Sequence, residues 1–92
     1  MTAPTRDIVA AQVKNLLASV SNRPNAQVLV QDETTDLQND LGIWADAKAA
    51  LATDYTRIAK GYDHGTAVTR SEAAKCDTVK VAIDTVFKHA QG

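Results

Sequence analysis

The sequence contains a single cysteine and only two histidines, and this scarcity excludes several kinds of site. Cys76 has no second cysteine in the chain with which to form a disulfide. Together with His64 and His89 it gives none of the spacings by which proteins hold a zinc ion, so we expect no metal site. A lone thiol is typical of a reducing compartment, and we expect a cytoplasmic protein.

Aromatic residues and long apolar runs are also scarce. Aromatic side chains make up 4% of the chain, which predicts a core of Ala, Val, Leu and Ile and argues against a large aromatic binding surface. No apolar run approaches the roughly 18 residues that a membrane-spanning helix needs. The stretch MTAPTRDIVAAQV has no charged segment followed by a continuous apolar run. We therefore expect neither a membrane span nor a secretory signal.

No excess of one charge is present. The chain has 10 Lys and Arg against 11 Asp and Glu, giving a net charge of -1, and the two signs are interspersed. Because no basic stripe faces outward, we expect no nucleic-acid partner. With 92 residues, of which 45% are apolar and 23% charged, the sequence predicts one small domain over residues 1–92, and we expect it to be a monomer.

Apolar residues recur at helical spacing in three stretches of the chain. The first predicts a helix over residues 6–20, with a threonine before it as the cap. The second predicts a helix that starts at Asp46, its expected N-cap, and ends near Gly61. The third predicts the most amphipathic helix of the chain, from a cap at Asp77 to about residue 92.

The segments between these stretches predict a short helix and a long loop. Thr69 and Glu72 have the spacing of a capping box, in which each side chain bonds the other's exposed backbone amide. Residues 21–39 are rich in Asn, Asp and Thr, which favour turns. Residues 28–30 are apolar enough for a strand but have no partner strand, and we expect them in the loop. The fold class is therefore all-α, a four-helix bundle with three long helices and one short.

Three segments give the chain a resemblance to a known family: QVKNLL at 12–17, NDLG at 39–42, and AAKCDTVKVAIDTVFKHAQ at 73–91. Their order and spacing, across nearly the whole chain, resemble an acyl carrier protein. The resemblance implies an acyl-carrier-like four-helix bundle with a long first loop. It also implies a part in lipid metabolism, in which the domain presents acyl or polyketide intermediates to the enzymes of fatty acid or polyketide biosynthesis.

The attachment residue of that family is missing. Members carry a Ser in an Asp-Ser-Leu triplet after the DLG, and its hydroxyl is esterified by 4′-phosphopantetheine; here the triplet reads Trp44, Ala45, Asp46. An alanine methyl cannot form that ester. The serines of the chain, Ser19, Ser21 and Ser71, all lie elsewhere in the sequence. As sequenced, the chain therefore takes no cofactor, and 4′-phosphopantetheine is expected only if the natural residue at position 45 is Ser.

Two functions remain open. Either the domain is a carrier, whose natural residue at position 45 is Ser or whose family role survives in an altered form, or the sequence has diverged into a prosthetic-group-free protein-protein interaction module on the carrier fold. Because Trp44 and Asp46 depart from the triplet as well, natural divergence is favoured. Family members show their partners an acidic second helix, whereas residues 46–60 are mixed in charge, so docking to the usual partners is also in question. The residues expected to recognise a protein partner are Asp40, Leu41, Gly42, Trp44, Asp46 and Lys48.

Each of the remaining candidate residues could have a functional role or only a structural one. Trp44 either anchors a partner or packs over the end of the bundle, and we favour packing. Cys76 is expected on a buried face and both histidines in solvent. We find no nucleophile with a nearby base, so we expect no enzyme. The resemblance implies an acyl-chain cavity between the helices, although apolar residues at helical spacing more often form ordinary core. The residues that would line this cavity are Leu51, Tyr55, Ile58, Tyr62 and Ile83.

Overall fold

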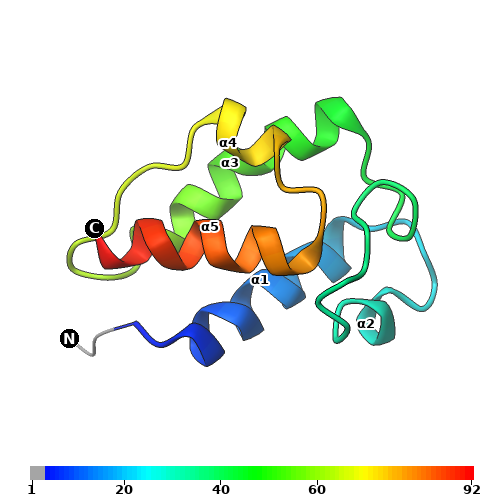
Figure 1. The fold of residues 1–92 in the computed structure, drawn as a ribbon, viewed down its shortest axis with the longest axis horizontal. Helices are drawn as coiled ribbons and strands as arrows, with labels where there is room; N and C mark the ends of the chain where they lie inside the picture. The colour runs from blue at the N-terminus through cyan, green and yellow to red at the C-terminus, as the bar shows by residue number, and fades with distance from the viewer. Residues whose placement is uncertain (1–3) are drawn as a thin grey trace.

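The computed structural model describes residues 4–92, and the secondary-structure elements of this part of the chain are all helices (Figure 1). Residues 1–3, which belong to the expected domain and to the N-terminal stretch inspected for a signal, lie outside it. Among residues 4–92, no helix has the length and apolar character needed to cross a membrane. The helices are α1 (Arg6–Val20), α2 (Ala26–Leu29), α3 (Ala45–Ala59), α4 (Arg70–Ala74) and α5 (Val79–Gln91).

The C-terminal helix α5 lies at the centre of the molecule and contacts both α1 and α3 (Figure 1). Most of its apolar stripe is buried, because one face of the helix is apolar at every turn, and Phe87 of the same stripe is partly buried against the core. The expectation that this stripe forms a core face is confirmed. The buried residues of α5 are Val79, Ala82, Ile83, Val86 and Ala90.

Two of the four predicted helix N-caps are confirmed and two are wrong. The hydroxyl of Thr5 accepts from the Ile8 amide at 3.3 Å, and Thr69 and Glu72 form the predicted capping box. Asp46 is not the cap of α3, because the helix begins one residue earlier, at Ala45. The cap of α5 is Thr78 rather than Asp77.

The expected four-helix bundle needs one correction, because the long loop contains a further helix. Residues 26–29 form one α-helical turn, α2, where the sequence predicted loop. Val30, which follows this turn, is fully buried, and the Thr35 hydroxyl donates to the Leu29 carbonyl at 2.6 Å. The turn is stabilised by this packing against the core, since four residues are far too few to form a helix alone.

The second half of the long loop is hydrogen-bonded to the first turn of α5. The Leu37 amide donates to the Asp77 carbonyl at 2.9 Å, and the Val79 amide donates to the Thr35 carbonyl at 3.0 Å. Between them, Asp36 and Thr78 form an antiparallel bridge that does not extend into a strand. Leu37 is fully buried beneath this contact, so the loop has a defined path over the core.

A charged cluster ties the loop to the two helices on either side of it. The Arg6 guanidinium donates two hydrogen bonds to the Glu33 carboxylate, at 2.8 and 3.1 Å, and a third to Asp84 at 2.9 Å. The cluster therefore links α1, the loop and α5. The hydrogen bonds from Arg6 lower the pKa of the Glu33 carboxyl below its ordinary value.

A second polar cluster joins the α3–α4 loop and α4 to the end of α5. Nε2 of His89 lies 2.7 Å from the Glu72 carboxylate, and Nδ1 lies 2.7 Å from the Thr66 hydroxyl. The Thr66 amide also donates to the His89 carbonyl at 2.9 Å. The expectation that both histidines are exposed is therefore wrong for His89, whose side chain is 15% exposed, while His64 is exposed. The last turn of α5, which the sequence predicts to be exposed, is covered by the α3–α4 loop.

Replacing Tyr55 by Phe is expected to stabilise the protein. Tyr55 is fully buried, its hydroxyl has no hydrogen-bond partner among the described residues, and burial raises its pKa. Because an unpaired buried hydroxyl costs on the order of 1 to 3 kcal/mol, Tyr55→Phe should raise the melting temperature by several degrees. Tyr62→Phe is the control, since that hydroxyl donates to Gln12 at the surface. A lower melting temperature for Tyr55→Phe would show that its hydroxyl has a partner.

The Glu72–His89 contact predicts a loss of stability in acid. The hydrogen bond from His89, followed by that from the Thr69 amide, lowers the pKa of Glu72 from 4.5 to about 2. A carboxyl whose pKa is depressed in the folded state stabilises it above about pH 4.5 and loses this contribution as pH falls toward 2. Because Glu72 is partly exposed, the contribution should be at most about 1 kcal/mol. Thermal unfolding of wild type and Glu72→Gln should differ near pH 6 and converge near pH 2; a constant difference would contradict the assignment.

Candidate functional site

The residues before α3 form a tight turn held by two aspartates. The Asp36 carboxylate accepts from the amides of Gln38 and Asn39, each at 2.8 Å. The Asp40 carboxylate reaches back and accepts from the Asp36 amide at 2.9 Å. These local bonds compete with helix formation and keep the chain turning until Gly42. The DLG motif is thus a structured entry to α3.

Gly42 supplies the backbone conformation that the turn requires. Its φ is +72°, a region that residues with a side chain rarely adopt. A Cβ atom at this position would also lie 2.6 Å from the side-chain oxygen of Asn22. On either side of the glycine, Leu41 and Ile43 are buried, so the turn is anchored to the core while Gly42 reverses its direction.

Ala45 is the first residue of the 15-residue helix α3 and is exposed. Trp44 takes the cap position but provides no side-chain hydrogen bond to the backbone amides of the first turn. Asp46, in the first turn, places a negative charge where the helix dipole favours one. Position 45 is therefore a solvent-facing helix start.

One hydroxyl lies closer to this turn than the sequence suggested. The Ser21 hydroxyl donates to the Leu41 carbonyl at 2.7 Å, across 20 residues of chain. It also accepts from the Arg23 amide at 3.2 Å and is partly buried. These bonds commit it to holding the turn at the end of α1. No periodicity or motif in the sequence pointed to this contact, because it depends on how α1 ends beside the loop.

Two of the expected partner-recognition residues do not reach the surface. Leu41 is fully buried, and Lys48 is only 7% exposed. The Lys48 ammonium bonds the Asp77 carboxylate at 2.9 Å and so joins α3 to the segment before α5. The surface that remains available to a partner consists of Asp40, Gly42, Trp44 and Asp46.

Trp44 is 59% exposed, so the expectation that it packs over the end of the bundle is wrong. It directly follows Ile43, which lines a pocket of about 230 Å³ between α3, the turn and the end of α1. Ala47 also lines this pocket and is exposed, although it begins the run of apolar residues at helical spacing that predicts the buried face of this helix. The Lys48 side chain, next to it in the sequence, is buried. The pocket is lined by Val20, Gly42, Ile43, Ala47, Ala50, Leu51 and Asp54.

The residues expected to line an acyl cavity lie mainly in the packed core. Leu51 alone among them lines the pocket beside Trp44. Tyr55 and Ile83 are fully buried in the core, and Ile58 and Tyr62 pack against it from its edge. Their arrangement corresponds to the plain-core interpretation of the stripe.

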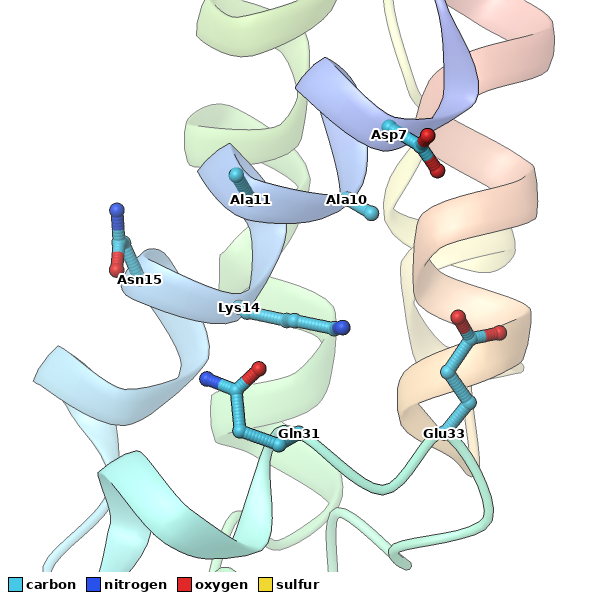
Figure 2. A pocket seen from close by; sticks show the side chains of 7 residues that line it. All are labelled: Asp7, Ala10, Ala11, Lys14, Asn15, Gln31 and Glu33. Atoms are coloured by element: carbon cyan, nitrogen blue, oxygen red, sulfur yellow. The ribbon is translucent and has the colours of Figure 1, made fainter.

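A second pocket of about 220 Å³ lies between α1 and the loop that follows α2 (Figure 2). Figure 2 shows the Lys14 side chain extending from α1 over Gln31, toward the side where Asp7 and Glu33 present their carboxylates. The lining thus mixes one cation with two acids, and no one sign of charge dominates it. No sequence pattern predicts this pocket, since its residues come from α1 and from the loop after α2.

The chemistry available elsewhere is limited. Within residues 4–92, no group of three or more His, Cys, Asp or Glu side chains is arranged to hold a metal ion. Cys76 is buried, as expected, and its thiol donates weakly to the Glu72 carbonyl at 3.4 Å. Burial raises the pKa of this thiol, which disfavours the reactive thiolate.

The Lys48–Asp77 pair predicts an asymmetric response to substitution. The Lys48 side chain is 9% exposed, whereas that of Asp77 is 68% exposed. Asp77→Ala should destabilise the protein by about 1–3 kcal/mol because it leaves a buried ammonium without its acceptor. Lys48→Met should cost less, since it removes the buried charge and leaves Asp77 in solvent. The midpoint of urea unfolding, at an unchanged m-value, measures the stability of each variant. A larger loss for Lys48→Met than for Asp77→Ala would contradict this prediction.

Comparison of the chain with protein-family models, with curated proteins and with solved structures found no match. The candidate site is an exposed helix start, preceded by the Gly42 turn and flanked by an exposed tryptophan and an apolar pocket.

Proposed function

We propose that this chain is an acyl-carrier-like domain that presents the start of α3 to enzymes of acyl or polyketide synthesis. The observation that carries the proposal is the position of Ala45, exposed at the first residue of a long helix directly after the DLG turn. This is where a carrier needs its attachment residue. The order of elements, with a long loop before α3 and the short α4 before α5, supports the same proposal.

The start of α3 suits a phosphate group for a physical reason. The first amides of a helix have no partner within the helix, and the dipole favours negative charge at this end. Trp44 contributes no capping acceptor, and Ala45 has no side chain beyond its methyl group. A serine at position 45 would place its oxygen at the helix start. As sequenced, the chain has no oxygen there, so it docks without 4′-phosphopantetheine.

A second candidate is a module that binds a protein partner and never carried an arm. The exposure of Trp44 favours it, because large exposed aromatic side chains contribute strongly to protein interfaces. The apolar pocket that begins at Ile43 could receive a side chain of the same partner. The two candidates share one surface and differ in whether an enzyme that loads carriers recognises it.

Introducing a serine at position 45 separates these candidates. We expect Ala45→Ser, incubated with a phosphopantetheinyl transferase and coenzyme A, to gain the mass of the arm on an otherwise unchanged chain. Wild type should gain nothing, because the Ser21 hydroxyl beside the turn is committed to the Leu41 carbonyl and the Arg23 amide, and Ser19 and Ser71 lie in other helices. Intact-mass spectrometry followed by peptide mapping locates the modification.

A triple variant, Trp44→Asp with Ala45→Ser and Asp46→Leu, controls for the neighbouring residues. If it is loaded while Ala45→Ser alone is not, Trp44 or Asp46 blocks the transferase, and the partner-binding candidate gains support. If neither variant is loaded and both unfold at the wild-type temperature, position 45 is not a carrier site and the proposal fails.

A further inference from the structure

The polar cluster of Thr66, His89 and Glu72 holds the α3–α4 loop and α4 against the end of α5. Its hydrogen bonds also place the three side chains in a series that this structural role does not require. The Thr66 hydroxyl lies 2.7 Å from Nδ1 of His89, and Nε2 of the same ring lies 2.7 Å from the Glu72 carboxylate. A hydroxyl, an imidazole and a carboxylate in series, each within hydrogen-bond reach of the next, is the arrangement by which proteins activate a nucleophile.

The carboxylate decides which ring nitrogen carries the proton. Ionised Glu72 can only accept hydrogen bonds, so Nε2 of His89 must donate to it. In the neutral ring Nδ1 then carries a lone pair, and it faces the Thr66 hydroxyl. The hydroxyl also lies 3.3 Å from the His89 carbonyl, a longer contact than the 2.7 Å to Nδ1, so Nδ1 is the nearer acceptor for the hydroxyl proton. The roles of the two nitrogens are exchanged relative to a serine protease, but the order of nucleophile, base and orienting acid is the same.

Each member of the series is held in place by a further contact. The Glu72 carboxylate accepts from the Thr69 amide at 3.1 Å, as part of the capping box. The His89 side chain is 15% exposed, so its ring is enclosed on most sides. The Thr66 amide donates to the His89 carbonyl at 2.9 Å, while the residue itself is exposed. A rigid base therefore lies beside a hydroxyl that solvent can reach.

We propose that Thr66 is an acyl-acceptor site, at which His89 acts as general base and Glu72 orients the ring. The substrate class is a small activated acyl compound, an aryl ester or a thioester. The C-terminal end of α5, which carries His89, lies at the opposite end of the molecule from the start of α3 (Figure 1), so the site is independent of the proposed docking function.

The reaction balances without a cofactor or a redox partner. The Thr66 oxygen attacks the carbonyl carbon, and its proton moves to Nδ1 of His89. A tetrahedral intermediate forms and then expels the phenolate or thiolate, which leaves with the proton from Nδ1. The products are an ester on the Thr66 oxygen and a free phenol or thiol. Because Thr66 is on an exposed loop, small acyl groups are favoured over long chains.

The probe is p-nitrophenyl acetate, applied to the full chain near neutral pH. We expect one acetyl group on the peptide that contains Thr66, with release of nitrophenolate at the same rate. Ser71, an exposed hydroxyl nearby, is the internal control, because no histidine bonds to it among the described contacts. Since a general base typically contributes on the order of 100-fold or more, Thr66 should be acetylated roughly 100-fold faster than Ser71.

Four variants test the roles of the three residues. Thr66→Val should remove the label from this peptide, and Thr66→Ser should restore it. His89→Gln should lower the Thr66 rate by about 100-fold, to that of an unassisted hydroxyl. Glu72→Gln keeps a side chain able to complete the capping box, so the helix should persist while the rate falls because the ring tautomer is no longer imposed.

Circular dichroism melts of the same variants separate chemistry from stability. The pH profile of the Thr66 rate in wild type should differ from that of His89→Gln, because a general base takes part only in its unprotonated form. Equal acetylation of Thr66 and Ser71, or an unchanged Thr66 rate in folded His89→Gln, would overturn the proposal and leave the cluster as a structural clamp.

Discussion

The attachment of the long loop to the first turn of α5 is the constraint on which the rest of the structure depends. Two backbone hydrogen bonds, from Leu37 to Asp77 and from Val79 to Thr35, join segments that are 40 or more residues apart in the sequence. They also satisfy polar groups that would otherwise face the apolar core, which makes the contact costly to break. Because α5 packs against both α1 and α3 and buries its apolar face, these bonds fix the position of the loop relative to the core.

From this anchor the chain has little freedom before α3 begins. Leu37, Leu41 and Ile43 enter the core, and Gly42 turns the backbone between the last two. The start of α3 is therefore held by buried residues rather than by a mobile loop. A partner that bound here would lose no free energy to ordering the segment. Lys48 strengthens the support by bonding Asp77, the residue whose carbonyl holds the loop.

The two ends of the molecule offer different chemistry. The end at the start of α3 has an exposed tryptophan, an apolar pocket and free backbone amides, which suit recognition of a partner. The other end has a hydroxyl, an imidazole and a carboxylate in hydrogen-bonded series. The helices α3 and α5 run between the two ends, so either end can be altered by substitution with little direct effect on the other.

The sequence by itself determined the helical class, the extent of α1, the capping box of α4 and the buried stripe of α5. These features follow from local hydrogen bonding and from the 3.6-residue period, which involve neighbours in the chain. It also placed Ala45 near a helix start, because the DLG turn is a local signal.

Only the tertiary structure decided the state of the residues whose environment comes from distant segments. Trp44 is exposed, and Lys48 is buried with its ammonium bonded to Asp77, which only the tertiary fold brings to α3. The α2 turn forms because the core supports it, and His89 is enclosed because the α3–α4 loop folds over the end of α5. Periodicity predicts which face of a helix is apolar. It contains no information about which polar group the partner segment will bring to that face, and here those groups decide both candidate sites.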